Sequence, residues 1–325
     1  MRPTTRWLLR ASVLVACVSS AAVMAQGTAS KSLRVIVAFP AGGGADILMR
    51  IVSPAVSERI GQNLVIENRP GASGLIGAQV AVTAAPDCQT VTLATSSNFS
   101  VMPSMVSKPP YDPLTDFSPI AMIATAPLML TVHPSLPARS VRELIALAKA
   151  KPRELLFATN GAGSISHLAT ELFQDAGGIE MTHVPYKGGT PAATDTIAGH
   201  VSLIITAIPT LSAHVQAGRL RGLGVTGASR SKLFPELPAI AESGLPGYSA
   251  IQWYGLLGPK GLSQECVAGL NRHFSAALGA ADVSDRFLKS GSEPAPMMAA
   301  DFAAFIRADV EKWARVIKSK NIKLN

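Results

Sequence analysis

Aromatic residues, charged residues and cysteines are all scarce in this chain of 325 residues. Aromatic residues account for 5% of it and charged residues for 15%, while apolar residues reach 48%. Because so apolar a chain can bury a sizeable core, an intrinsically disordered protein is excluded, and one large or two medium domains are expected. Basic runs are absent too, which argues against a nucleic acid as partner.

The N-terminal segment has the features of a secretory signal peptide. Arg2, Arg6 and Arg10 precede a run without charge from Ala11 to Val23, and Val23-Met24-Ala25 has the small residues of a signal-peptidase site. We therefore predict that residues 1–25 are a signal peptide and that the protein is exported. No other stretch reaches the roughly 18 apolar residues that a membrane-spanning helix needs.

An alternative processing site overlaps this segment. Leu14-Val15-Ala16-Cys17 resembles the lipobox of a bacterial lipoprotein, but only about six uncharged residues then follow Arg10. Cleavage after Ala25 is therefore favoured over a lipid anchor on Cys17. Removing three arginines from the 29 Lys and Arg leaves 26 against 21 Asp and Glu, and this charge of +5 suits a protein that receives anions.

Two cysteines, Cys88 and Cys266, remain in the exported chain. An oxidising compartment permits a disulfide between them, but the sequence leaves open whether they pair or stay as free thiols. The six histidines are scattered, and no Cys/His spacing fits a metal site. Neither a metal ion nor a cofactor is therefore expected.

Short β-like runs alternate with helical stretches along the chain, which indicates βαβ units and mainly parallel sheets. The chain is expected to enter a second lobe near residues 120–125 and to leave it near 242–248. The prediction is a two-lobed α/β fold with a cleft between the lobes, in which residues 26–124 and 247–325 form lobe 1 and residues 125–246 form lobe 2. The predicted strands cover residues 33–39, 64–67, 90–95, 128–132, 155–158, 181–184, 201–206 and 220–225.

Three loops that follow strands carry the candidate binding residues, because ligands of open α/β sheets sit beyond the carboxyl ends of the strands. The first loop combines three glycines with a helix start, so its backbone N–H groups can approach an anion closely. The third loop also leads into a helix and is rich in hydroxyl and amide groups. The residues concerned are Phe39, Pro40, Ala41, Gly42, Gly43 and Asp46 in the first loop, Ser96, Ser97 and Asn98 in the second, and Thr159, Asn160, Gly161, Ser164 and Ser166 in the third.

These loops fit other classes of site poorly. A dinucleotide-binding fingerprint would need a third glycine where Ile47 stands, and a P-loop would need a following Gly-Lys-Ser/Thr. A secreted serine hydrolase that uses Ser164 or Ser166 with His167 is the alternative from another class, but no Gly-x-Ser-x-Gly elbow is present. Two facing helix N-termini instead favour a small anion, above all a carboxylate.

A series of motifs in the same order resembles a known family. Val37-Ala38-Phe39-Pro40-Ala41-Gly42-Gly43-Gly44-Ala45-Asp46 resembles the first loop of the Bug receptors, the periplasmic substrate-binding proteins of tripartite tricarboxylate transporters. The similarity extends from about Leu33 to Leu324. The further matching blocks are Val65–Gly71, Tyr111–Pro113, Asp116-Phe117, His133–Pro137, Glu143–Lys149, His183–Gly189 and Glu242–Tyr248.

This resemblance implies a type II periplasmic-binding fold whose two lobes close on a ligand, without catalysis, metal or cofactor. It implies a periplasmic receptor, expected to be a monomer, that captures a di- or tricarboxylic or aromatic acid and presents it to membrane permease subunits. The first loop would meet one ligand carboxylate through backbone groups and water, and the third loop would contribute from lobe 2. Ser96, Ser97, Asn98 and Tyr186 would line the cleft. A receptor that feeds a signalling partner is the alternative.

One departure from the family bears on specificity. Many members carry an Asp-Asn pair where this chain has Thr206-Ala207. The acidic group that would meet a ligand ammonium is absent, which favours plain carboxylic acids over amino acids. Thr206 and Ala207 are therefore expected to help decide which acid is bound.

Overall fold

The computed structural model describes residues 32–186, 189–320 and 322, so the predicted signal peptide lies outside the described residues. The strands are β1 (Leu33–Val37), β2 (Leu64–Asn68), β3 (Thr90–Thr95), β4 (Phe117–Val132), β5 (Leu156–Thr159), β6 (Thr182–Pro185), β7 (Leu203–Ala207), β8 (Arg221–Val225), β9 (Ile251–Pro259) and β10 (Glu293–Met297). The helices are α2 (Gly44–Ile60), α3 (Leu75–Val82), α4 (Met102–Met105), α5 (Val141–Ala150), α6 (Ile165–Gly177), α7 (Gly189–Ile197), α8 (Ile208–Gln216), α9 (Gln264–Leu278), α10 (Ala281–Lys289) and α11 (Ala299–Ser319), with short turns η2 (Ala72–Gly74), η3 (Ser96–Val101) and η4 (Ala241–Ser243).

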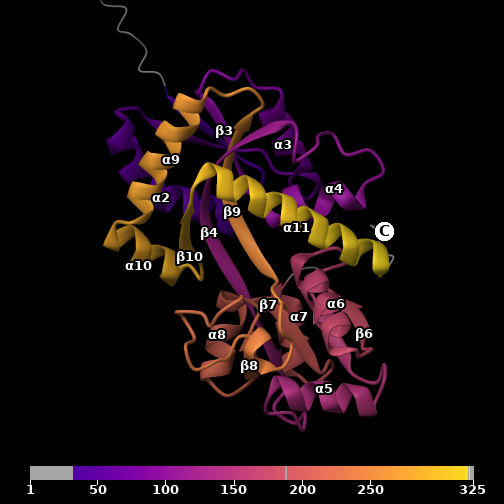
Figure 1. Cartoon of the computed structure of the whole chain (residues 1–325). Helices are drawn as coiled ribbons and strands as arrows, with labels where there is room; N and C mark the ends of the chain where they lie inside the picture. Colours follow the sequence, from indigo (N-terminus) through magenta and orange to yellow (C-terminus); the bar gives the residue numbers. More distant parts are fainter. Residues whose placement is uncertain (1–31, 187–188, 321, 323–325) are drawn as a thin grey trace, which may run out of the picture.

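Two globular parts are joined by β4 and β9, which run from one part into the other (Figure 1). We call the part around β1, β2 and β3 the first lobe and the part around β5 to β8 the second lobe. The strands form one mixed sheet in the order β2-β1-β3-β9-β4-β7-β5-β6, with β8 and β10 also paired to β4. Strand β1 is parallel to its neighbours β2 and β3, and β5 is parallel to β6 and β7, whereas every pair made by β4 or β9 is antiparallel.

Strand β4 carries the chain between the lobes. Its residues 117–127 pair with β9, and its residues 128–132 pair with β7 and β8. Parallel strands end at the same edge of a sheet, so the loops after β1 and β3 in the first lobe lie together, as do the loops after β5 and β7 in the second. The fold therefore directs both sets of loops towards the junction of the lobes.

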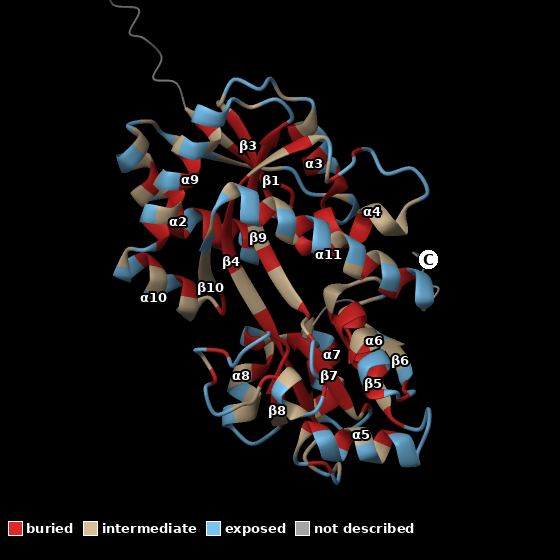
Figure 2. Cartoon of the chain, in the orientation of Figure 1, coloured by how far each residue is buried: buried red, intermediate tan, exposed pale blue. Residues whose placement is uncertain are grey.

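Each lobe has its own apolar core, seen as the red interior in Figure 2. Strands β1 and β3 pack with α2 and α9 in the first lobe, and β5 and β7 pack with α5 and α6 in the second. Helix α11 belongs to both. Phe302 and Ile306 lie in a first-lobe cluster, whereas Trp313, Val316 and Ile317 join the core of the second lobe.

Cys88 and Cys266 form a disulfide, with Cα atoms 6.1 Å apart, which resolves the pairing that the sequence left open. The bond ties the turn before β3 to the first turn of α9. It therefore lies at the opposite end of β3 from the Ser96-Ser97 turn. The cross-linked residues are 178 apart in sequence, and closing so long a loop restricts the unfolded chain enough to stabilise the fold by about 5 kcal/mol.

The alternation of strands and helices predicted from the sequence is confirmed from β1 to β8, but β4 is longer than predicted and β9 and β10 were missed. Glycine interrupts β9 for a packing reason, because a Cβ on Gly255 would lie 2.0 Å from Phe302 Cζ of α11. Strand β10 contains Pro294 and Pro296, which only an edge or irregular strand tolerates. Strand β9 has Ile251 as its only β-branched residue, and β10 has none.

No helix in the described part of the chain combines the length and the apolar character that crossing a membrane requires. In residues 32–186 and 189–320, no three His, Cys, Asp or Glu side chains are grouped so that they could share a metal ion.

Candidate ligand-binding cleft

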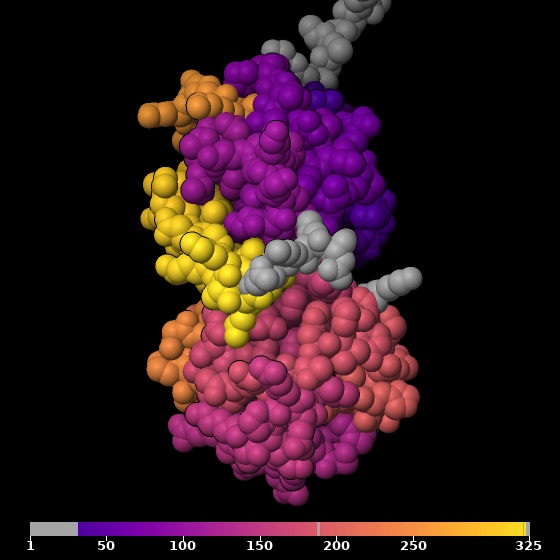
Figure 3. All heavy atoms as spheres, turned by 90° about the vertical axis from the view of Figure 1, so that its right-hand side faces the viewer, coloured from indigo at the N-terminus to yellow at the C-terminus, as the bar shows by residue number. Residues whose placement is uncertain are grey.

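Two adjoining cavities lie where the lobes meet, and Figure 3 shows the surface narrowing there. A cavity of about 260 Å³ lies against the first lobe, and one of about 340 Å³ takes walls from both lobes. Phe39 and Ser97 line both cavities, so they form one continuous cleft. The smaller cavity is lined by Phe39, Pro40, Gly43, Gly44, Ala45, Thr95, Ser97, Gln252 and Tyr254. The larger is lined by Phe39, Ser73, Ser97, Met102, Asn160, Ala162, Gly163, Ser164 and Ile165.

Asp46 holds the first loop in place through hydrogen bonds on its buried side. Its side chain is only 1% exposed. Asp46 Oδ2 accepts hydrogen bonds from Gly42 N at 2.9 Å and from Arg50 Nε at 2.7 Å. Asp46 Oδ1 accepts from Asn68 Nδ2 at 3.1 Å, and the same amide donates to Phe39 O at 3.0 Å. The carboxylate thus fixes both ends of the loop, and Gly42 permits the turn with a φ of +78°.

The charge state of Asp46 follows from these contacts. Burial by itself would raise the pKa of this carboxyl, but the hydrogen bonds from Arg50, Gly42 and Asn68 outweigh it and hold the pKa below its usual value of 3.8. Asp46 is therefore ionised at neutral pH. It acts as a buried anchor of the loop, and its charge is already paired with Arg50.

The N-terminus of α2 opens into the smaller cavity. Gly43 is the N-cap and has no side chain to accept the first N–H groups of the helix. Gly43, Gly44 and Ala45 line the cavity. Since the first turn of a helix lacks internal acceptors for its N–H groups, these donors and the positive end of the helix dipole face the space for the ligand.

The third loop presents the start of α6 in a similar way. Ser164 is the N-cap, and its Oγ accepts from His167 N at 3.2 Å and donates to Gly161 O at 2.7 Å. Asn160 Oδ1 accepts a hydrogen bond from Thr206 Oγ1 at 2.9 Å. Because this bond uses the amide oxygen, the NH₂ group of Asn160 is the part that can donate to a ligand.

Six of the residues predicted from the sequence line the cleft: Phe39, Pro40, Gly43, Ser97, Asn160 and Ser164. Five others have buried side chains behind it: Ser96, Asn98, Thr159, Ser166 and Thr206. Asn98 Oδ1 accepts from Thr95 N and Thr95 Oγ1, and Ser166 Oγ donates to Ile205 O, so these polar groups shape the loops.

The remaining predicted residues lie at the periphery of the two cavities. Ala41 and Gly42 are exposed, and Gly161 and Ala207 are partly buried. Tyr186 Oη donates to Asp195 Oδ2 at 2.7 Å. Burial, and then this hydrogen bond, raise the pKa of Tyr186 to about 12, so its phenol is neutral at physiological pH.

Sequence reasoning missed the wall that β9 contributes. Gln252 and Tyr254 line the smaller cavity, while Trp253 between them points to the other side of the sheet, where its Nε1 donates to Asp309 Oδ2 at 2.7 Å. This is the alternation of a strand, and it would have identified both residues had β9 been predicted. Burial raises the pKa of Tyr254 to about 12, which keeps its phenol neutral and able to donate a hydrogen bond.

The described part of the cleft lining is without charged side chains. Among the residues lining either cavity in that part of the chain, none is Lys, Arg, Asp or Glu. Hydroxyl, amide and backbone N–H groups are therefore the polar groups that it offers. Such a lining suits an anion held by helix N-termini and charge-assisted hydrogen bonds.

A serine nucleophile is not assembled in this cleft. Ser164 Oγ donates to Gly161 O and Ser166 Oγ donates to Ile205 O. His167 Nδ1 accepts from Gly163 N at 3.1 Å. Neither hydroxyl is bonded to an imidazole, which a nucleophile and its general base require.

Two α/β lobes around a cleft of this kind are the architecture of a solute-binding protein. The chain belongs to the tripartite tricarboxylate transporter family receptors, whose family model matches residues 48–322. It is similar to Protein BugT of Bordetella pertussis, with 35% identity over 98% of this chain and 99% of the relative. The resemblance to Bug receptors noted in the sequence is thereby confirmed.

Solved structures agree with this assignment. Rpa4515 of R. palustris with adipate is 36% identical, with a TM-score of 0.75 over 91% of this chain and 99% of that one. MatC of Rhodopseudomonas palustris with bound malate is 26% identical, with a TM-score of 0.69 over 88% and 98%. A TctC solute-binding protein from Polaromonas without ligand is 28% identical, with a TM-score of 0.80 over 90% and 99%.

Replacing Asp46 with Asn should lower the free energy of unfolding by about 2 kcal/mol at neutral pH, because it removes the charge that Arg50 and the loop amides stabilise. The folded pKa of Asp46 lies below its unfolded value near 3.8, so its stabilisation is complete above that value and is lost as pH falls through the folded pKa. Urea denaturation should therefore show the gap between wild type and Asp46→Asn shrinking below about pH 4.

Asp301→Asn is the matched control, since Asp301 is also in the first turn of a helix but is exposed. It should change the free energy of unfolding by no more than about 0.5 kcal/mol at any pH. Equal effects of the two substitutions would contradict the anchoring role of Asp46.

Proposed function

We propose that this protein captures a small dicarboxylic, tricarboxylic or aromatic acid in the cleft and presents it to membrane permease subunits of a tripartite tricarboxylate transporter. The observation that carries the proposal is the cavity lined from both lobes, into which the N-termini of α2 and α6 open without a side-chain charge from the described lining residues. The solved relatives with adipate and malate support the same chemical class of ligand.

The protein would act in the periplasm as a monomer. Residues 1–25 would direct export and be removed after Ala25, with a lipid anchor on Cys17 as the less favoured outcome. The disulfide between Cys88 and Cys266 supports an oxidising compartment.

In our proposal the cleft closes by rotation of lobe 1, residues 26–124 and 247–325, against lobe 2, residues 125–246. Strands β4 and β9 would be the hinge, since they are adjacent and both pass between the lobes. The ligand would bias this equilibrium by contacting both lobes only in the closed form. Tyr248 and the end of α11 reach into the core of the second lobe and would limit the rotation.

Each loop would have a distinct part in binding. The backbone of the first loop, with bound water, would take one carboxylate, and the third loop would take the opposite end of the ligand. Ser97 would contact the ligand directly, while the buried groups would keep the loops in shape. These roles are assigned to Phe39, Pro40, Ala41, Gly42, Gly43 and Asp46, to Ser96, Ser97 and Asn98, to Thr159, Asn160, Gly161, Ser164 and Ser166, and to Tyr186, Thr206 and Ala207.

A thermal-shift panel of adipate, malate, citrate and nicotinate tests the carboxylate proposal. An acid present at about a hundred times its Kd should raise the Tm by roughly 5 °C, because selective binding to the folded state adds about 2.7 kcal/mol. Adipamide, which has the shape of adipate without its charges, is the control and should give no shift. If none of the acids raises the Tm at millimolar concentration, the proposal is wrong.

Thr206→Asp should change the preference between glutarate and glutamate, which differ by one ammonium group. The new carboxylate behind Asn160 would repel a plain dicarboxylate and attract the ammonium, so the ratio of the two affinities should move towards glutamate by about tenfold. Calorimetric titration measures the ratio. Thr206→Asn, of similar size but uncharged, should leave it unchanged, and an unchanged ratio in Thr206→Asp itself would refute the role of this position.

A further inference from the structure

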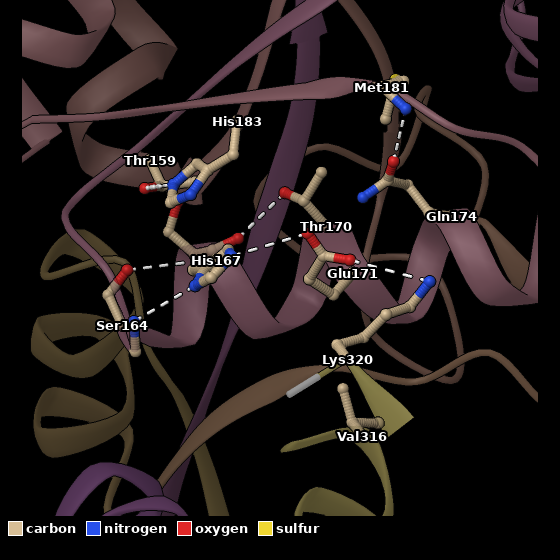
Figure 4. A network of polar contacts seen from close by, with 12 residues as sticks. Thr159, Ser164, His167, Thr170, Glu171, Gln174, Met181, His183, Val316 and Lys320 are labelled. Carbon is tan, nitrogen blue, oxygen red and sulfur yellow. Dashed lines mark hydrogen bonds and ion pairs between the residues drawn. The ribbon is translucent and has the colours of Figure 1, made fainter. Parts of the chain in front are cut away.

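Two histidine rings are stacked next to the third loop (Figure 4). His167 comes from α6 and His183 from β6. Their ring centroids are 4.0 Å apart and their planes differ by 11°. Phe157 of β5 lies beside both rings, with its centroid 5.0 Å from that of His183 and 6.4 Å from that of His167. The pair is therefore held between a helix and the sheet.

Each ring contacts the third loop through one nitrogen. His167 Nδ1 accepts from Gly163 N at 3.1 Å. His183 Nε2 is 2.6 Å from Thr159 Oγ1, and Thr159 Oγ1 in turn accepts from Gly161 N at 3.3 Å. The two imidazoles thus fix two backbone N–H groups on either side of Ala162. Asn160 precedes Gly161 and Ser164 follows Gly163 in the chain, and both of these neighbours line the cleft.

The hydrogen bond from Gly163 N requires His167 to be neutral, and the stacking of the two rings disfavours a charge on both. Nδ1 of His167 can accept from Gly163 only without a proton, which leaves the proton on Nε2, 3.5 Å from Glu171 Oε1. Thr159 Oγ1 accepts from Gly161 N, and its own proton can go either to Gly161 O at 3.4 Å or to an unprotonated His183 Nε2 at 2.6 Å. Two positive charges in rings 4.0 Å apart would repel each other.

The charges around the pair come from α6 and from the end of α11. Glu171 of α6 faces His167, and its other oxygen is 3.8 Å from Lys320 Nζ. Lys320 also pairs with Asp175 at 2.6 Å. Sheet strand β5 contributes only the neutral Phe157 to the stack. The pKa of His183 is lowered to about 4 by burial first and then by His167, while Glu171 acts in the opposite direction.

We propose that His167 and His183 are positioning residues, which as a neutral stacked pair hold the third loop in its ligand-binding conformation and release it when either ring gains a proton. This inference deepens the proposed function, on which it rests, by adding a pH dependence to the same cleft. The ligand does not touch the imidazoles; they act on it through Gly161 and Gly163.

The sign of the pH effect follows from proton counting. The held loop keeps His183 neutral down to about pH 4, whereas a released, solvated ring would have its ordinary pKa of 6.5. The released state therefore binds more protons between these values, and lowering the pH within that window favours it. Ligand affinity should fall in the same window, because the ligand selects the held loop.

Calorimetric titration with adipate at pH 7.5 and pH 5 tests the inference in a matched set of variants. His167→Ala removes the acceptor of Gly163 N and should weaken binding about tenfold at pH 7.5. His167→Asn should stay within about threefold of wild type, because Asn Oδ1 can take the place of Nδ1. His133→Asn alters a histidine of the second lobe outside the stack and should bind as the wild type does.

The pH profile separates positioning by neutral imidazoles from simple packing. Wild type should lose about tenfold in affinity from pH 7.5 to pH 5, and the double variant His167→Asn/His183→Gln, which cannot be protonated, should lose clearly less. The change in the ionisation of adipate between the two pH values affects the wild type and the variants equally, because all of them are titrated with the same acid. Equal losses in wild type and double variant would overturn the inference, as would unchanged binding by His167→Ala.

A measurement without ligand distinguishes failure of this inference from failure of the proposed function. Nitrogen-15 NMR should show wild-type His167 as the Nε2–H tautomer, and hydrogen exchange should show the Gly163 amide protected in wild type and exposed in His167→Ala. If these hold and neither adipate nor another acid of the panel binds, the proposed function fails while the positioning of the loop stands. If Gly163 exchanges equally in both proteins, the positioning role is wrong whatever binds.

Discussion

In our proposal, backbone N–H groups stabilise the charge of an anion in this cleft, because none of the described residues lining it carries a positive side chain. Such donors bind a ligand well only when the loop that presents them is rigid. The N–H groups of a mobile loop are not held in position for the ligand and form hydrogen bonds with water instead. The rest of the site follows from this constraint. Asp46 anchors the first loop from its buried side, and the imidazoles of His167 and His183 anchor the third.

The same constraint explains how much of the site was predictable. Glycine-rich turns before helices can be read from a sequence, so the loops from Phe39 and from Thr159 were found. A sequence does not distinguish a polar residue that faces the ligand from one that holds the loop, because both need the same chemistry. Asn98 and Ser166 are of the second kind, with side chains bonded within the protein.

The fold shows a similar division. The strands with apolar runs were predicted closely, including β5 and β8, which have few β-branched residues. Strand β9 was missed, and its Gly255 makes room for Phe302 of a helix that follows much later in the chain. That contact joins residues far apart in the chain, so no local sequence pattern predicts it. Missing β9 also hid Gln252 and Tyr254. The packing of helix α11 on both lobes is likewise visible only in three dimensions.

The central claim is that backbone donors of both lobes hold the ligand. A crystal structure with the best-binding acid tests it most directly. The account predicts one carboxylate at hydrogen-bond distance, about 3 Å, from first-loop N–H groups or their bound water, and the opposite end of the ligand against Asn160, Ser164 and the start of α6. An acid bound outside the cleft, or held there mainly by a lysine or arginine side chain, would contradict it.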